Sequence, residues 1–152
     1  RGTGPGVSIE RNTTTLELGK SQYCRQGKKI ALLGFGSMLG AAIEAGKALD
    51  ATVVNMRFIK PLDSHVLNEV AQQHELIVTI EENAIMGGAG TAVLEHYQRH
   101  NIQISVLTLG LPDHYIAHGD HSQQLAALGL DATGILKSVQ QRLQPCNSTA
   151  AI

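Results

Sequence analysis

The chain has 152 residues, 43% of them hydrophobic and 16% charged, and its 12 lysines and arginines nearly balance 13 aspartates and glutamates, giving a formal net charge of −1. This length suits one domain with its own core, and the composition excludes a disordered charged tail. The near-neutral charge argues against a nucleic-acid-binding surface, and no apolar run approaches the roughly 20 residues that span a bilayer. We therefore expect a protein that binds neither nucleic acid nor membrane.

The first 27 residues are rich in Gly, Thr and Ser and show no sustained helical period. We expect residues 1–27 to be a linker that leads in from an upstream domain and ends in a short edge strand at residues 20–25. The start at Arg1 has no signal-peptide pattern, which fits a piece of a longer chain. Cys24 and Cys146 lie near opposite ends, without disulfide or metal-ligand spacing, and are expected to stay reduced.

Short apolar runs alternate with helical stretches from residue 28 onward. Such runs, at residues 30–33, 52–54, 76–80 and 104–107, are typical of buried strands. Three crossover helices follow the first three runs, and further helices follow the last. The pattern predicts a three-layer α/β/α sandwich over residues 28–143 with a mostly parallel sheet.

Helix boundaries carry capping signals. Ser37 and Asp63 precede the first two helices and can accept hydrogen bonds from first-turn N–H groups, as Asp131 can for the last helix. Gly129 is expected to end a short helix at residues 122–128. Residues 144–152 are expected to form a disordered tail.

A glycine-rich turn follows the first buried strand, and Gly34, Gly36 and Gly40 form a relaxed version of the dinucleotide-binding pattern. The position that would hold an acid for the ribose of NAD is Asn55, and Arg57 nearby suits a 2′-phosphate. An NADP-like ligand is therefore one interpretation. A tight strand-to-helix turn without any ligand is the other, and we favour it because the acid is missing.

Glu81 and Glu82 end a buried strand and invite an acid–base interpretation. Adjacent strand residues point in opposite directions, so only one of them can face a given cleft, and we expect no catalytic role. The following glycines would let another backbone, ligand or domain approach, and the apolar residues beside them would be exposed. We expect an interface loop formed by Ile85, Met86, Gly87 and Gly88.

Two groups of histidines resemble metal sites. His96 and His100 are spaced by four on a helix, and His114, His118 and His121 share an aspartate-rich loop at residues 113–121. Neither has the spacing of a zinc motif, so we expect no metal site.

Longer motifs carry a resemblance to a family. They are MRFIKPLD at residues 56–63, EENAIMGGAG at 81–90, GLPD at 110–113 and LGLDA at 128–132. In order and with consistent spacing, the chain resembles the C-terminal domain of the 1-deoxy-D-xylulose-5-phosphate synthase family. The resemblance implies the transketolase C-terminal fold, a five-stranded mixed sheet with one antiparallel strand.

The resemblance also implies what the parent enzyme does. Such enzymes use thiamine diphosphate and Mg²⁺ to decarboxylate pyruvate and join its two-carbon unit to D-glyceraldehyde 3-phosphate, at the entry to non-mevalonate isoprenoid biosynthesis. The cofactor is held by upstream domains, so this chain alone is expected to be inactive. Its expected partners are those domains and, in a homodimer, a second copy. Arg1 matches an arginine that grips the substrate phosphate, a task suited to a guanidinium.

Two other classes of function stay open on the residues alone. The chain could be a free-standing NADP-like nucleotide-binding or regulatory module, or a dimerisation module. The resemblance implies a bacterial cytoplasmic enzyme, with a plastid enzyme as the alternative.

Overall fold

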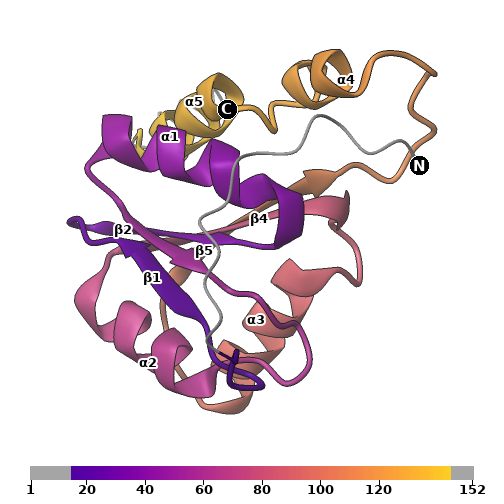
Figure 1. Cartoon of the computed structure of the whole chain (residues 1–152). Helices are drawn as coiled ribbons and strands as arrows, with labels where there is room; N and C mark the ends of the chain where they lie inside the picture. The colour runs from indigo at the N-terminus through magenta and orange to yellow at the C-terminus, as the bar shows by residue number, and fades with distance from the viewer. Residues whose placement is uncertain (1–14, 145–152) are drawn as a thin grey trace, which may run out of the picture.

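The computed structural model describes residues 15–144 and places five strands in one sheet of order β1-β3-β2-β4-β5 (Figure 1). β1 runs antiparallel to β3, and every other pair of neighbours is parallel. The predicted mixed sheet with its antiparallel edge strand is therefore confirmed. The strands are β1 (Gln22–Arg25), β2 (Ile30–Gly34), β3 (Thr52–Asn55), β4 (Leu76–Ala84) and β5 (Ser105–Leu111). Arg1, Cys146 and residues 145–152 of the predicted tail at 144–152 lie outside the described residues.

Helices cover both faces of the sheet, as the predicted sandwich requires. Figure 1 shows α1 and α5 on one face and α2 and α3 on the other. A short 3₁₀ turn, η1, connects β2 to α1. The helical elements are η1 (Gly36–Met38), α1 (Leu39–Leu49), α2 (Ser64–Gln73), α3 (Ala89–Arg99), α4 (His121–Ala127) and α5 (Ala132–Leu143).

The core forms two apolar layers separated by the sheet. Ile30 and Leu32 of β2 pack in the layer beneath α1 and α5, whereas Ala31 and Leu33 pack in the layer beneath α2 and α3. Successive strand residues point to opposite faces, so a strand covered on both faces needs an unbroken apolar run. This is why these strands are recognisable in the sequence.

The first helix begins differently from the prediction. Ser37 lies inside η1, and Met38, which precedes α1, makes no side-chain cap hydrogen bond. The Ser37 hydroxyl instead donates to Oε2 of Glu82 at 2.6 Å. The predicted cap was wrong because a carboxylate 45 residues further along the chain takes the hydroxyl.

The other predicted caps are confirmed. Asp63 accepts from the backbone N–H of Val66 at 3.3 Å, and Asp131 accepts from that of Gly134 at 2.8 Å. Ser21 donates to the other Asp63 oxygen through its backbone N–H at 2.9 Å and its hydroxyl at 3.0 Å. Burial alone would raise the pKa of the Asp63 carboxyl, but these donated hydrogen bonds outweigh burial and hold the pKa below its ordinary value.

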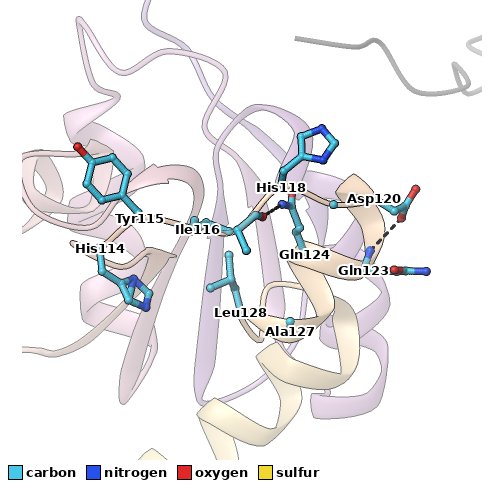
Figure 2. Close-up of a pocket in the computed structure, with 11 residues that line it drawn as sticks. His114, Tyr115, Ile116, His118, Asp120, Gln123, Gln124, Ala127 and Leu128 are labelled. Atoms are coloured by element: carbon cyan, nitrogen blue, oxygen red, sulfur yellow. Dashed lines mark hydrogen bonds between the residues drawn. The ribbon is translucent and has the colours of Figure 1, made fainter.

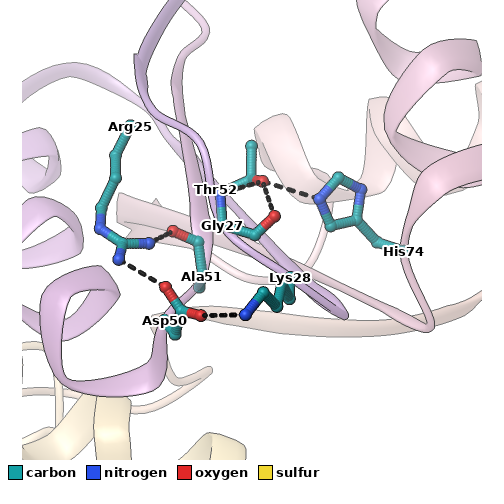
Figure 3. A network of polar contacts seen from close by, with 7 residues as sticks. All are labelled: Arg25, Gly27, Lys28, Asp50, Ala51, Thr52 and His74. Atoms are coloured by element: carbon teal, nitrogen blue, oxygen red, sulfur yellow. Dashed lines mark hydrogen bonds and ion pairs between the residues drawn. The ribbon is translucent and has the colours of Figure 1, made fainter.

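A polar network fixes the edge of the sheet where β1 meets the chain before β3 (Figure 3). The Arg25 guanidinium donates to the Ala51 carbonyl at 2.6 Å and to Asp50 at 2.7 Å. Its hydrogen bond is the main cause that lowers the pKa of the Asp50 carboxyl. Behind it, the buried Thr52 hydroxyl lies 2.7 Å from Nε2 of His74. The edge of the sheet is thus stabilised by the Arg25–Asp50 ion pair on its exposed side and by the Thr52–His74 hydrogen bond inside.

Two strands run further than predicted. β4 continues past residue 80 to Ala84, and β5 continues past residue 107 to Leu111. Their pairing resumes after a register shift, with Ala84 opposite Leu111. Glu81 and Glu82 therefore belong to a strand, where alternation of side chains directs them to opposite sides.

Candidate functional site

The carboxyl ends of β2, β3, β4 and β5 lie at one edge of the sheet, because these four strands are parallel. From β2 the chain goes first to β3 on one side, and β4 then pairs on the other side, which leaves a crevice between the ends of β2 and β4. A hollow of about 380 Å³ occupies this position. It is lined by Phe35, Gly36, Ser37, Ile59, Glu81, Glu82, Asn83 and Ala89.

Glu81 is engaged in the fold. Its side chain is buried, and its two oxygens accept hydrogen bonds from the backbone N–H groups of Ala89 and Gly90, both at 2.8 Å. Those N–H groups begin α3, where a helix has unpaired donors and favours negative charge. A buried carboxylate that accepts two backbone donors stabilises the start of α3.

The glycines after Glu81 make room for its carboxylate. A Cβ on Gly88 would lie 2.4 Å from Oε2 of Glu81, and a Cβ on Gly90 would lie 3.3 Å from Oε1 of Glu81 and 2.5 Å from Oγ1 of Thr79. The close approach expected from these glycines is therefore made by the chain's own Glu81. Gly87 differs, since its positive φ of 74° turns the loop while nothing lies within 4 Å of its Cβ position.

Glu82 joins three segments of the chain. Its side chain is 18% exposed, its Oε2 accepts from Ser37, and its Oε1 accepts from Nε2 of His121 at 2.7 Å. Sequence reasoning missed His121 as its partner, because the two residues are 39 positions apart. We call these three side chains the Glu82 clasp; they connect η1, β4 and α4.

The predicted nucleotide-binding residues do not form a phosphate site. The Glu82 carboxylate lies beside the glycine-rich turn and would repel a diphosphate there. Asn55 accepts from the backbone N–H of Arg57 at 3.2 Å, and the Arg57 guanidinium donates to Gln22 of β1. This arrangement favours the interpretation of the turn as a feature of the fold.

The aspartate- and histidine-rich loop at residues 113–121 leads into α4 (Figure 2). Asp120 caps α4 by accepting from the backbone N–H of Gln123 at 3.1 Å, and the Gln124 side chain donates to the Ala117 carbonyl. Contact with Ser122 is the main cause that lowers the pKa of the Asp120 carboxyl. Within residues 15–144, no group of three His, Cys, Asp or Glu side chains is arranged to hold a metal ion.

His96 and His100 support the helix packing. His96 Nε2 donates to the Asn68 amide oxygen at 2.9 Å, and His100 Nδ1 donates to the His96 carbonyl at 2.8 Å. Burial, together with repulsion from the neighbouring His100 and Arg99, lowers the pKa of the His96 imidazole.

The predicted interface loop lies at the same edge of the sheet as the crevice. Met86 is 72% exposed, Gly87 is exposed, and Ile85 and Gly88 are half-buried. Ile85 is held by a hydrogen bond from its backbone N–H to the Leu111 carbonyl at 3.0 Å. Met86 thus projects from a loop whose base is fixed to β5.

Comparison with known proteins gives a consistent result. The family model described as "Transketolase, C-terminal domain" matches residues 19–135. The chain is 56% identical over 143 residues to the 1-deoxy-D-xylulose-5-phosphate synthase of Nitrosomonas eutropha and 53% identical over 143 residues to that of Methylobacillus flagellatus. Each match covers 94% of this chain but 23% of the relative, so the chain spans about a quarter of the length of these relatives.

Solved structures agree with the match to the transketolase C-terminal domain. A split gene transketolase, solved as an inactive beta4 tetramer, superposes with a TM-score of 0.77 at 30% identity over 90% of this chain and 45% of that one. A 2-oxoglutarate:ferredoxin oxidoreductase from Magnetococcus marinus shares the fold at 12% identity, with a TM-score of 0.52. No helix within the described residues is long and apolar enough to cross a membrane.

Proposed function

The chain belongs to the transketolase C-terminal domain family, and on this premise we propose that it is the C-terminal domain of a 1-deoxy-D-xylulose-5-phosphate synthase. The observation that carries the proposal is 56% identity to such an enzyme over nearly the whole chain. The parent enzyme would condense pyruvate, with decarboxylation, and D-glyceraldehyde 3-phosphate. Its product would feed isoprenoid biosynthesis in the bacterial cytoplasm.

The domain would support catalysis without carrying it. The described residues do not fit thiamine diphosphate: both glutamates at the crevice are engaged within the fold, and Glu82 would repel the diphosphate. Thiamine diphosphate and Mg²⁺ would be held by the upstream catalytic domains, and this chain alone would be inactive. Glu81 would serve α3 and the stability of the fold.

Further roles complete the proposal. Residues 28–143 would form the domain, and residues 1–27 would lead in from the catalytic domains. Arg1 would bind the phosphate of glyceraldehyde 3-phosphate, a planar ionic contact that a guanidinium makes well. The loop from Ile85 to Gly88 would contact neighbouring domains within a homodimer, as the exposure of Met86 supports.

A chimeric enzyme tests this function. The region of the Nitrosomonas eutropha synthase that matches this chain is replaced by the chain itself, and formation of deoxyxylulose phosphate is measured with pyruvate and glyceraldehyde 3-phosphate. We expect the chimera to turn over and the same enzyme truncated before this region to be inactive. A folded chimera that binds thiamine diphosphate but makes no product would contradict the proposal.

A further inference from the structure

Exposed apolar side chains concentrate at the carboxyl edge of the sheet. Among the described residues, large exposed hydrophobic side chains occur at Leu16, Leu18, Ile59, Met86, Leu94, Tyr115, Ile116 and Leu143. Four of these lie on the loops that follow β3, β4 and β5, and those loops leave the sheet at one edge because the strands are parallel. We call this set the carboxyl-edge surface; it consists of Ile59, Met86, Tyr115 and Ile116.

The carboxyl-edge surface extends across Glu82. One hollow, of about 380 Å³, contains Ile59 and Glu82, and a second, of about 370 Å³, contains Ile116, His121 and the same Glu82. Glu82 therefore separates two depressions, each of which has an exposed apolar residue in its wall. Concave apolar pockets beside projecting side chains are typical of the centre of protein interfaces.

Tyr115 is the most exposed of these residues. Its side chain is fully exposed, at 105% of the reference area, and Figure 2 shows its ring standing away from Ile116 and from α4. Tyrosine contributes a large rigid contact area at a low cost in conformational entropy, and it is enriched among residues that dominate binding energy. A fully solvated tyrosine next to an exposed isoleucine leaves apolar area that no other residue of 15–144 covers.

The loops are held in place by polar contacts. α4 contains no fully buried residue, but the Glu82 clasp joins it to β4 and η1, and Gln124 donates to the Ala117 carbonyl. These contacts orient the residue 113–121 loop without covering its apolar side chains. An interface whose loops are ordered beforehand loses less entropy when its partner binds.

We propose that the carboxyl-edge surface docks against an apolar patch on the catalytic domains that precede this chain in its parent synthase. This inference rests on the proposed function. The relatives have about three quarters of their length outside the matched region, which supplies a covalently attached partner at high effective concentration. Glu82 is then a positioning residue, because it acts through Ser37 and His121 on the loops that make contact.

Hydroxyl-radical footprinting tests the proposal, since methionine and tyrosine react readily when they are exposed. Oxidation of Met86 and Tyr115 is measured in the free chain and in the full-length chimera. We expect both rates to fall about tenfold in the chimera, because interface cores exclude water. Leu94, an exposed residue on α3 away from this edge, is the control and is expected to keep its rate.

Three outcomes separate the proposal from its rivals. If Met86 and Tyr115 oxidise equally fast in the free chain and in the chimera, the docking surface is wrong, and turnover of the chimera still reports independently on the proposed function. If both residues are already protected in the free chain, and sedimentation shows a dimer, the occupant is a second copy and the proposal is overturned. Protection that appears in the chimera alone supports it.

A variant sharpens the same test. Tyr115→Ser in the chimera removes the ring, and because Tyr115 is fully exposed the substitution should leave the fold of this domain unchanged. We expect Met86 to regain part of its reactivity in this chimera, because the contact loosens. Leu94→Ser is the matched control and is expected to leave Met86 protected; equal reactivity of Met86 in the two variants would contradict a shared interface.

Discussion

Helices α4 and α5 follow one another along the chain and lie on the same side of the sheet, yet they are held in different ways (Figure 1). α5 places Ile135 and Val139 in the core with no exposure at all. α4 has no fully buried residue, and Leu125 only packs partly against the core. Polar contacts to Asp120 and Glu82 hold its first turn.

This difference separates the part of the domain that is stable by itself from the part that we expect to bind a partner. An element held by buried area is stable within its own chain, because apolar burial dominates folding energy. An element held by half-exposed hydrogen bonds opens at a lower free-energy cost and is typical of binding segments. α5 therefore belongs to the stable core, and α4 belongs to the surface that we expect the catalytic domains to cover.

The largest effect is expected from shortening a buried side chain of α5. Ile135→Ala leaves a cavity in a fully buried site and should lower the free energy of unfolding by about 3 kcal/mol. Leu125→Ala in α4 removes a similar side chain from a half-buried site and should cost about 1 kcal/mol. Urea unfolding at neutral pH measures both. Equal losses would break the contrast between the two helices.

The second effect concerns the buried member of the glutamate pair. Glu81→Gln keeps the shape but replaces one acceptor by an amide NH₂, which faces the N–H group of either Ala89 or Gly90. The one unsatisfied donor should cost about 2 kcal/mol in the free energy of unfolding. A chemical unfolding curve unchanged by this substitution would show that the carboxylate is not needed at α3.

The third effect adds a pH dependence at α2. The folded pKa of Asp63 lies below its unfolded value of about 3.9. Its contribution to stability is therefore present above about pH 4 and is lost as the pH falls through the folded pKa. Asp63→Ala should cost about 1 to 2 kcal/mol at pH 7 through loss of the cap and the Ser21 contacts.

Asp63→Asn is the matched control for that prediction. It keeps an oxygen for Val66 but has no charge, so its loss at pH 7 should be smaller than that of Asp63→Ala. Its free energy of unfolding should also change less between pH 5 and pH 2.5 than that of the unsubstituted chain. Thermal unfolding of both proteins between pH 5 and pH 2.5 measures this difference. An acid dependence identical to that of the parent protein would assign the effect to other carboxyls.

The smallest effect on global stability is expected at Glu82, the less buried member of the pair. Glu82→Gln weakens the contacts with Ser37 and His121 and should change the free energy of unfolding by about 1 kcal/mol or less. Its effect is expected to be local: amide hydrogen exchange should speed up in α4 and stay unchanged in α5. Uniformly faster exchange in both helices would show that the clasp supports the core.

The sequence predicts the fold well where one physical signal dominates. The apolar runs mark strands that are buried on both faces, and Asp63 and Asp131 mark helix starts because a cap is a local interaction. Ser37 shows the limit of such reasoning. Its hydroxyl binds Glu82 instead of the neighbouring N–H groups, and no local pattern reports a contact 45 residues away.

The site was harder to predict than the fold. Adjacent glutamates suggested acid–base chemistry, and only the alternation of side chains along a strand indicated that the two would point in opposite directions. In the structure Glu81 binds the start of α3 and Glu82 binds His121 of α4. Tyr115 carried no signal, because a single aromatic residue in a polar loop has no periodicity. Its meaning depends on which other loops reach the same edge, which is a property of the strand order.

Hydrogen exchange on α4 and α5, compared between the free chain and the full-length chimera, tests the central claim most directly. The claim is that the catalytic domains of the parent complete the edge that this chain leaves exposed. Exchange in α4 and in the residue 113–121 loop should slow markedly in the chimera, while α5 should be protected equally in both. If α4 exchanges as fast in the chimera as in the free chain, the carboxyl edge is not where this domain meets the rest of its enzyme.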